Sequence, residues 1–180
     1  RLGERIDGYR VLRSWVYATP NEGIVKKTLG HLSFMATSVF AQWRNIRDVD
    51  VVVVSSPTFF SIFSAWILAR LKNAKLVVEV RDLWPAIFVE LGVITNRLLV
   101  RLLERIELAA YRAADVVVVV SDGFRDNIIE RGIPAAKVHT IRNGVDLTRF
   151  SARTGSSARL RSELGAGEGE VLVIYVGAHG

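Results

Sequence analysis

The chain of 180 residues is long enough for one ordinary domain and part of a second. Half of its residues are apolar and 23% are charged, which is typical of globular proteins and excludes the disordered and fibrous classes. The net charge of +6 favours an anionic partner, and the absence of cysteine excludes disulfides and cysteine-based metal or nucleophilic sites. The longest strongly apolar stretch, residues 58–69, is shorter than the roughly 20 residues that cross a bilayer.

The N-terminal part of the chain predicts one strand and one long helix. The sequence enters at Arg1 without an initiator methionine or a signal-peptide pattern, so we expect a piece of a longer protein. Residues 9–17 alternate in polarity, which predicts a strand nearer the edge of a sheet. Residues 24–46 carry apolar side chains at steps of three and four, which predicts a helix with a core-facing stripe. The stripe consists of Val25, Leu29, Leu32, Ala36, Val39, Trp43 and Ile46.

Two aromatic residues of this predicted helix lie off the apolar stripe. Phe34 and Phe40 are close in sequence to Lys26 and Lys27. Packing against the sheet accounts for the phenylalanines without any function. The alternative is an interfacial surface, where lysines face anionic lipid and aromatic rings enter the headgroup region.

Three later segments share a polar approach, a β-branched run, a polar end and a helix-like pattern. Their sequences are DVDVVVVSSPTFFSIF, NAKLVVEVRDLWPAIF and AADVVVVVSDGFRDNI. Continuously apolar runs are typical of strands that are buried on both faces of a parallel sheet. We therefore expect an α/β fold with a Rossmann-like, doubly wound parallel sheet.

A basic helix and a further strand complete this pattern. Residues 95–113 predict an amphipathic helix with Thr95 or Asn96 as its N-cap, and residues 137–143 predict a strand. One side of the helix is apolar and another is basic. The apolar side carries Leu98, Leu102, Leu103, Ile106 and Ala109, and the basic side carries Arg97, Arg101, Arg105 and Arg112.

The composition changes at Gly144, where glycine, serine and charged residues become frequent. We expect residues 1–143 to form a Rossmann-like domain that lacks its first strand and loop. Residues 144–170 are predicted to be a linker with a short helix from Ser157 to Leu164. Residues 171–180 are predicted to be the first buried strand and glycine turn of a second domain. The chain is therefore expected to be truncated at both ends.

Polar residues follow each predicted strand of the sheet. In open α/β sheets, ligands bind outside the carboxyl ends of the strands, so these residues are candidates for one site. They are Ser55, Ser56 and Pro57 after the first buried run, Arg81, Asp82 and Trp84 after the second, Ser121, Asp122 and Gly123 after the third, and Asn143 and Gly144 after the fourth.

Two pairs of these residues have simpler structural interpretations. In the first interpretation, Arg81 and Asp82 form a salt bridge within the loop and provide an N-cap for the helix after Pro85. In the second, which we favour, they bind sugar hydroxyls or phosphate. Ser121 and Asp122 are better explained as the N-cap of the following helix, with anion binding at the helix start as the alternative.

Glycines and histidines contribute less to the prediction. The GAGEGE segment at 165–170 precedes a strand, so it does not match a dinucleotide-binding loop. The glycines of YVGAHG follow a strand, where backbone amides can approach a phosphate. His31 and His139 have no partner at metal-ligand spacing, and we expect both to be structural.

Four segments, in order and spacing, resemble the N-terminal half of a family-4 glycosyltransferase of the GT-B fold. They are VVEVRDLWPAIFVELGVI, AADVVVVVSDGFRDNI, VHTIRNGVDLTRF and VLVIYVGAHG. The DLWP segment is similar to the bacterial branch that builds surface polysaccharides, including N-acetylfucosamine transferases. The resemblance implies two Rossmann-like domains, with the acceptor site on the first, a nucleotide-sugar on the second, and retaining transfer between them.

The resemblance also implies roles for the candidate residues. Arg81 and Asp82 fall where family members place a polar group, often histidine, against the donor sugar, so they are assigned to sugar or acceptor contact. Gly177 and Gly180 match the turn near the donor phosphates. The residues assigned to substrate binding are Ser56, Pro57, Trp84, Ser121 and Asn143.

The implied partners are a UDP- or GDP-linked sugar donor and a lipid-linked sugar acceptor, with no metal, no other cofactor and no nucleic acid. The expected location is cytoplasmic, peripheral on the inner face of the cell membrane, in polysaccharide or lipopolysaccharide synthesis. The glycine-rich loop and the glutamate pair of the family are absent from these residues, so this part alone is expected to be inactive. The alternative function is a non-catalytic Rossmann module that binds nucleotide or phosphate. Nucleic-acid binding ranks third, because the basic residues lack an aromatic stacking array.

Overall fold

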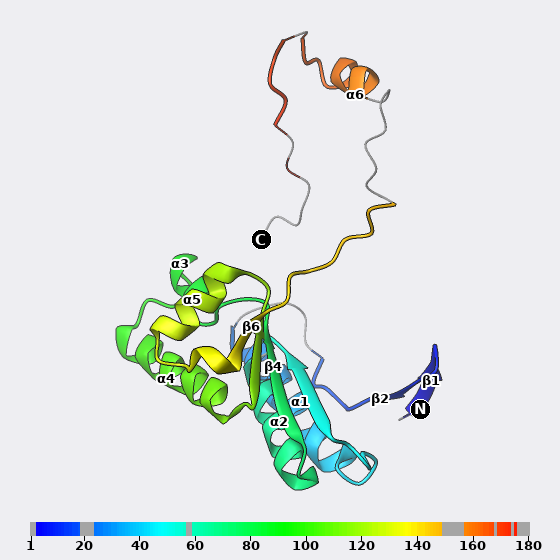
Figure 1. The fold of residues 1–180 in the computed structure, drawn as a ribbon, viewed down its shortest axis with the longest axis vertical. Coiled ribbons are helices and arrows are strands. Elements are labelled where there is room, and N and C mark those ends of the chain that lie inside the picture. The colour runs from blue at the N-terminus through cyan, green and yellow to red at the C-terminus, as the bar shows by residue number, and fades with distance from the viewer. Residues whose placement is uncertain are drawn as a thin grey trace. The chain divides into compact units, whose positions relative to one another are not determined.

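The structure is a computed structural model. Its described residues are 3–18, 24–56, 59–148, 157–167, 169–173 and 175. The chain divides into two compact units, residues 1–143 and 144–180. The first unit contains a four-stranded parallel sheet with the strand order β3-β4-β5-β6 and a separate two-stranded sheet (Figure 1). The strands of the larger sheet are β3 (Val51–Ser55), β4 (Lys75–Val80), β5 (Val116–Val119) and β6 (Val138–Thr140).

Helices connect successive neighbours in this sheet, as the repeated strand-and-helix pattern predicts. α2 (Phe59–Lys72) links β3 to β4, α4 (Arg97–Ala113) links β4 to β5, and α5 (Asp122–Glu130) links β5 to β6. The short α3 (Ala86–Glu90) precedes α4, and the 3-10 turn η1 (Ala135–Lys137) precedes β6. The predicted α/β fold, with a parallel sheet flanked by helices, is confirmed.

One hydrophobic core joins the sheet to α2, α4 and α5. Along β4, Leu76, Val78 and Val80 are buried, whereas the alternate side chains Val77 and Glu79 are half-buried. The sequence predicts burial on both faces of the strands, but only one face is fully covered. Because the strand order advances in one direction, right-handed crossovers place the three connecting helices on the same face. The core consists of Ile62, Ala65, Ala69, Leu76, Val78, Val80, Ala110, Tyr111, Ala114, Val117, Val119, Ile128, Ile133 and Val138.

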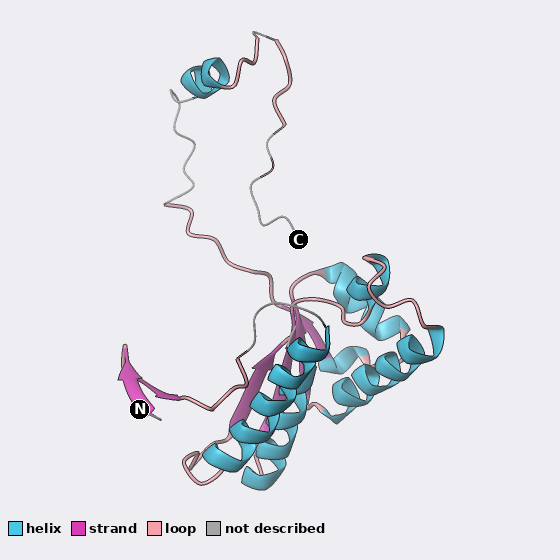
Figure 2. Ribbon diagram, turned by 180° about the vertical axis from the view of Figure 1, so that it is seen from behind, coloured by secondary structure: helices cyan, strands magenta, loops and turns pink. Residues whose placement is uncertain are grey.

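The first helix, α1 (Ile24–Gln42), lies beside α2 (Figure 2). Its predicted core-facing stripe is only partly correct, because Val39 is buried whereas Val25 and Leu29 are 72% and 50% exposed. The buried positions include Gln42, which donates a hydrogen bond to the Arg13 carbonyl at 2.9 Å. Packing on a neighbouring helix and on residues 13–17, instead of directly on the sheet, explains the difference.

The predicted N-terminal edge strand forms a local hairpin instead. β1 (Gly3–Ile6) and β2 (Tyr9–Leu12) pair antiparallel and are not part of the parallel sheet. The turn between them is Asp7-Gly8, and both residues have positive φ, 51° and 85°. An Asp-Gly pair favours a two-residue hairpin turn, and this local pairing replaces the predicted pairing with the larger sheet.

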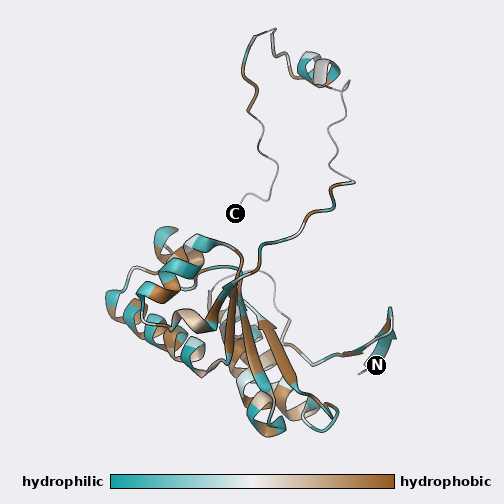
Figure 3. Cartoon of the chain, viewed as in Figure 1, coloured by the Kyte–Doolittle hydropathy of each residue, from teal (hydrophilic) through white to brown (hydrophobic). Residues whose placement is uncertain are grey.

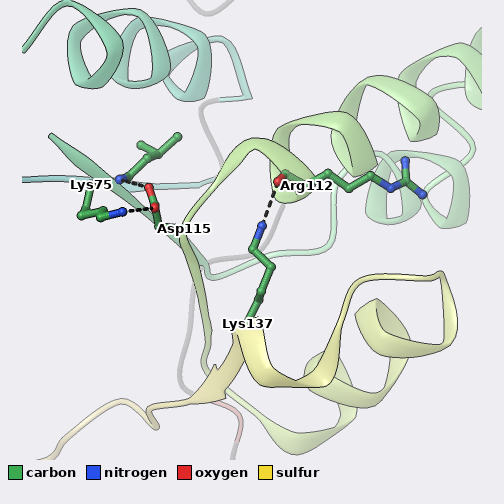
Figure 4. A network of polar contacts seen from close by, with 5 residues as sticks. Lys75, Arg112, Asp115 and Lys137 are labelled. Carbon is green, nitrogen blue, oxygen red and sulfur yellow. Dashed lines mark hydrogen bonds and ion pairs between the residues drawn. The ribbon is translucent and has the colours of Figure 1, made fainter. Parts of the chain in front are cut away.

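The amino ends of the strands are fixed by a polar network (Figure 4). Asp115, directly before β5, accepts hydrogen bonds from the Lys75 ammonium at 3.0 Å and the Leu76 amide at 2.9 Å. The Leu76 amide, and then Lys75, hold the pKa of Asp115 below its ordinary value. Lys137 donates to the Arg112 carbonyl at the end of α4 at 2.8 Å. These contacts position the starts of β4, β5 and β6.

The N-terminus of α4 has the predicted type of cap. Asn96, and not Thr95, is the N-cap, and its side chain accepts from the amides of Leu98 at 2.9 Å and Leu99 at 3.2 Å. This accepting carboxamide oxygen satisfies two of the unpaired amides of the first turn.

A buried ion pair connects α4 to the end of α5. The Glu107 side chain is 1% exposed, accepts the Tyr111 hydroxyl at 2.9 Å and pairs with the Arg131 guanidinium. Burial raises the pKa of Glu107 and that of Tyr111. Glu107, Ala110 and Tyr111 form the buried face of α4, so the apolar row predicted from Leu98 lies elsewhere on the helix.

The second unit contains α6 (Ser157–Glu163), close to the short helix predicted in the linker. The strand predicted at 171–180 does not form in its described residues, 171–173 and 175. Val171 and Val173 are 89% and 87% exposed. A strand needs a neighbour for its backbone hydrogen bonds, and these residues pair with none of the described strands.

None of the described helices combines the length and apolar character that a membrane crossing requires.

Candidate functional site

Strand register brings the candidate residues to one edge of the sheet, called here the carboxyl edge. Val80 pairs with Val119, and Val119 pairs with Thr140. Asp82, Ser121 and Arg142 each lie two residues after the end of a strand, and the three strands are neighbours in the sheet. The carboxyl edge therefore gathers residues that are far apart in the sequence, as expected for a parallel sheet.

Ser56 connects the loops that follow β3 and β4. Its side chain is buried, its amide donates to the Glu79 carbonyl at 2.8 Å, and its hydroxyl accepts from the Arg81 amide at 3.0 Å. Ser55 donates its hydroxyl to the Glu79 carboxylate. Ser56 thus positions the Arg81 backbone, and Pro57 lies outside the described residues.

Arg81 and Asp82 present a guanidinium and a carboxylate that are not used in the fold. Within the part of the chain that the structure describes, their side chains form neither an ion pair nor a hydrogen bond. The N-cap of α3 is Pro85, and no side chain caps that helix. The structure therefore contradicts the alternative of a loop salt bridge combined with an N-cap. Both charged groups remain available at the carboxyl edge.

Trp84 holds the loop that carries these two residues. Its ring lies edge-on to Phe88 of α3, with centroids 5.9 Å apart and an interplanar angle of 73°. Pro85, joined to Trp84 by a cis peptide bond, is buried. The aromatic pair and the buried proline fix the direction in which the chain leaves Asp82.

Ser121 is the N-cap of α5, as the sequence favours. Its hydroxyl accepts from the Phe124 amide at 3.3 Å. The Ser121 hydroxyl oxygen therefore already accepts one hydrogen bond within the fold. The predicted contact with substrate requires the same hydroxyl to make a second hydrogen bond.

Arg142 was not identified from the sequence, and it forms an ion pair with Asp122 at 2.5 Å. The pKa of Asp122 lies below its ordinary value because of the nearby Thr140 hydroxyl and then Arg142. The Thr140 hydroxyl lies near the Asp122 carboxylate, but it forms no hydrogen bond of standard geometry with a described residue. A basic residue two positions after β6, directly before Asn143, was the available sequence signal.

The remaining candidates are less defined by the structure. Asn143 is exposed and is the last residue of the first unit. Gly177 and Gly180 lie outside the described residues. In the described ranges, no three metal-ligating side chains come together, and the predicted absence of a metal stays a prediction.

The carboxyl edge thus combines, among its described residues, a free cation, a free carboxylate and an ion pair. Arg81 can donate two hydrogen bonds to a carboxylate or phosphate, and Asp82 can accept from a hydroxyl. Arg142 is largely neutralised by Asp122. This arrangement is suited to a polar, hydroxyl-bearing ligand with an anionic group.

Comparison with known protein families gives one match over most of the chain. Residues 1–144 match the model described as a glycosyl transferase 4-like domain. The α-maltose-1-phosphate synthase of Mycolicibacterium smegmatis is 38% identical over 76 residues. That match covers 40% of this chain and 19% of the synthase, so the chain corresponds to a minor part of that enzyme.

One solved structure supports the same α/β architecture. The crystal structure of Anabaena Alr3699/HepE in complex with UDP has a TM-score of 0.52 and 20% identity, covering 77% of this chain and 34% of that one. Its complex with UDP-glucose gives a TM-score of 0.49 and 22% identity. The first likeness supports the α/β fold, and this chain spans about a third of the Anabaena protein.

Proposed function

Because the chain belongs to the glycosyl transferase 4-like domain family, we propose that residues 1–143 are the acceptor-binding domain of a retaining glycosyltransferase. The enzyme moves a sugar from a nucleotide-sugar to a lipid-linked or glycan acceptor. The observation that carries this proposal is a pair of charged side chains at the carboxyl edge of the sheet, Arg81 and Asp82, that form no ion pair or hydrogen bond with any described residue.

Each residue has a defined role in this proposal. Asp82 accepts a hydrogen bond from a sugar or acceptor hydroxyl, and Arg81 binds an anionic oxygen near the reacting centre. Ser56 positions the Arg81 backbone through its 3.0 Å hydrogen bond. Trp84 and Asn143 contact substrate from the neighbouring loops. Transfer with retention needs fixed positive charge for the departing nucleoside diphosphate, and Arg81 supplies part of it.

The proposed donor is a UDP- or GDP-linked sugar. The Anabaena protein of similar fold was crystallised with UDP and with UDP-glucose, which supports a nucleotide-sugar of this type. Gly177 and Gly180 are proposed to lie near the donor phosphates. No metal is proposed to take part.

The proposed acceptor is a lipid-linked sugar in bacterial polysaccharide or lipopolysaccharide synthesis, with a specificity of the N-acetylfucosamine type. This acceptor requires the protein to work at the inner face of the cell membrane as a peripheral protein. The net charge of +6 supports contact with an anionic surface.

Sugar transfer by the protein that contains this chain tests the proposal. We expect Arg81→Ala and Asp82→Ala each to lower kcat/KM about 10- to 100-fold, the effect of losing a charge-assisted hydrogen bond. Arg47→Ala and Glu130→Ala are matched controls, because both residues are exposed and lie outside the carboxyl edge.

Unchanged turnover in both site variants would remove the assignment of Arg81 and Asp82. Nucleotide binding without any sugar transfer would instead support the alternative of a non-catalytic nucleotide-binding module. Isothermal titration with UDP and UDP-glucose separates these two results, because it measures binding independently of transfer.

A further inference from the structure

α4 carries leucines on its outer face that the core does not use. Leu98, Leu102 and Leu99 are 75%, 54% and 44% exposed. Glu107 and Tyr111 are buried and come nine residues after Leu98 and Leu102, so each lies on the opposite side of the helix from its leucine. Figure 3 shows hydrophobic and hydrophilic residues alternating around the helix.

Arginines run beside these leucines. Arg97, Arg101 and Arg105 are exposed and four residues apart, so they lie along one line of the helix. Within the described residues none of the three guanidinium groups has an ion pair or a hydrogen bond. Leu98, Leu102 and these three arginines are called here the α4 surface.

A hollow adjoins the α4 surface on the side of α3. It measures about 470 Å³. Arg97 and Arg101 lie at its border, and Glu104 is the carboxylate that lines it. The cations of the α4 surface outnumber this carboxylate three to one. The residues lining the hollow are Val89, Ile94, Thr95, Arg97, Val100, Arg101 and Glu104.

We propose that the α4 surface binds a membrane that contains anionic phospholipid. Leu98 and Leu102 enter the boundary between headgroups and acyl chains, and the arginines bind lipid phosphates. An exposed apolar row beside a basic row is the pattern of helices that lie in a membrane interface. Unpaired arginines on the same face complement negative lipid charge, whereas a purely apolar protein partner would leave them without counter-ions.

The position of the α4 surface suits the proposed reaction. α3 begins at Ala86, four residues after Asp82, and leads into α4 through residues 91–96. A short chain segment therefore connects α4 to the carboxyl edge. A membrane bound at α4 would hold its lipids on the side from which a lipid-linked acceptor has to reach this edge. The choice of a membrane as partner rests on the proposed function, but vesicle binding is measured without any transfer.

α1 is less suitable for this role. Phe40 is 80% exposed and Phe34 is 39% exposed, which agrees with the interfacial alternative derived from the sequence. However, Lys26 is engaged in an interaction within the fold, and the Lys27 side chain lies outside the described residues. Of these two helices, α4 is the one whose described residues combine exposed leucines with a row of unpaired cations.

Vesicle co-sedimentation tests the inference, with phosphatidylcholine vesicles that contain about 30% phosphatidylglycerol as the anionic membrane. We expect binding to these vesicles and little binding to pure phosphatidylcholine. The double variant Leu98→Gln/Leu102→Gln should bind about tenfold more weakly, because two exposed leucines no longer enter the boundary. The triple variant Arg97→Gln/Arg101→Gln/Arg105→Gln should bind about 100-fold more weakly, at about fivefold for each arginine.

Leu71→Gln and Arg47→Gln are matched controls, since both residues are exposed and belong to segments other than α4. Both should bind vesicles like the unaltered protein. The inference is wrong if the controls lose as much binding as the α4 variants, or if the unaltered protein binds no vesicles. It is also wrong if the leucine variant changes only the oligomeric state, which would identify a second copy of the chain as the partner.

Transfer to a water-soluble acceptor separates this inference from the proposed function. The α4 variants should keep that activity, because their residues do not lie at the carboxyl edge. Vesicle binding without any transfer would contradict the proposed sugar transfer alone. Transfer to the water-soluble acceptor without vesicle binding would contradict the α4 surface and the proposed peripheral location, and would leave sugar transfer itself supported.

Discussion

Asp115 shows how one side chain can set the register of two strands. Its carboxylate receives the Leu76 amide at the start of β4 and the Lys75 ammonium. The negative form makes these bonds, so the folded state favours it and the pKa is lowered. A group of this kind adds stability above its unfolded pKa and loses that contribution as the pH falls through the folded pKa.

The expected result for Asp115→Asn follows from this dependence of stability on pH. At pH 7 the variant should be less stable by about 0.5–1 kcal/mol, a small effect because the side chain is partly exposed to solvent. The difference should vanish below the lowered pKa, where the native carboxyl is also neutral. Urea unfolding at pH 7 and at acid pH measures it, with Asp126→Asn as the control. A difference independent of pH would contradict the electrostatic explanation.

At the scale of elements, α4 has two faces with different tasks. Its inner face carries Glu107, which ties it to Arg131 at the end of α5, and its outer face carries the α4 surface. A carboxylate in the core needs its partner, because an unpaired buried charge is strongly destabilising.

Arg131→Ala should therefore destabilise the protein by about 3–5 kcal/mol, because it leaves Glu107 unpaired in the core. The loss should shrink as the pH falls, since protonation removes the buried charge and burial already raises the Glu107 pKa. The double variant Glu107→Met/Arg131→Met should recover most of the stability. Denaturant unfolding measures the free energy of unfolding of the unaltered protein and of both variants. Arg125→Ala is the control, and a single variant as stable as this control would show that the pair contributes little.

At the scale of the whole molecule, buried residues that the structure describes form one hydrophobic core, in the first unit. Among the described residues, the core begins in α2 with Ile62 and ends in β6 with Val138. The first unit therefore contains the packing that stabilises its own sheet.

Removal of residues 149–180 should consequently change the melting temperature of the sheet by less than about 4 °C. Differential scanning calorimetry of the full chain and of residues 1–148 makes the comparison. Residues 1–112, which lack β5 and β6, are the control and should show no cooperative transition. A fall of more than about 10 °C in the longer piece would mean that the second unit supports the first.

Much of the candidate site was predictable because its residues follow recognisable strands. The β-branched runs located β3, β4 and β5, and their polar ends located Ser56, Arg81, Asp82 and Ser121. The cap at Ser121 was predictable from its local pattern. The Asp122–Arg142 ion pair was not, because it depends on strand pairing between residues that are 20 positions apart.

The sequence by itself determined the strand-and-helix order between residues 51 and 140, the parallel sheet and the family resemblance, because hydrophobic runs, caps and the VHTIRNGVDLTRF segment are local signals. Tertiary structure alone decided that residues 3–12 form a separate hairpin, that one face of the sheet is fully covered, and that Leu98 and Leu102 face outward. These outcomes depend on which surfaces meet. Local periodicity shows that a helix has an apolar side, whereas only packing determines whether the core uses it.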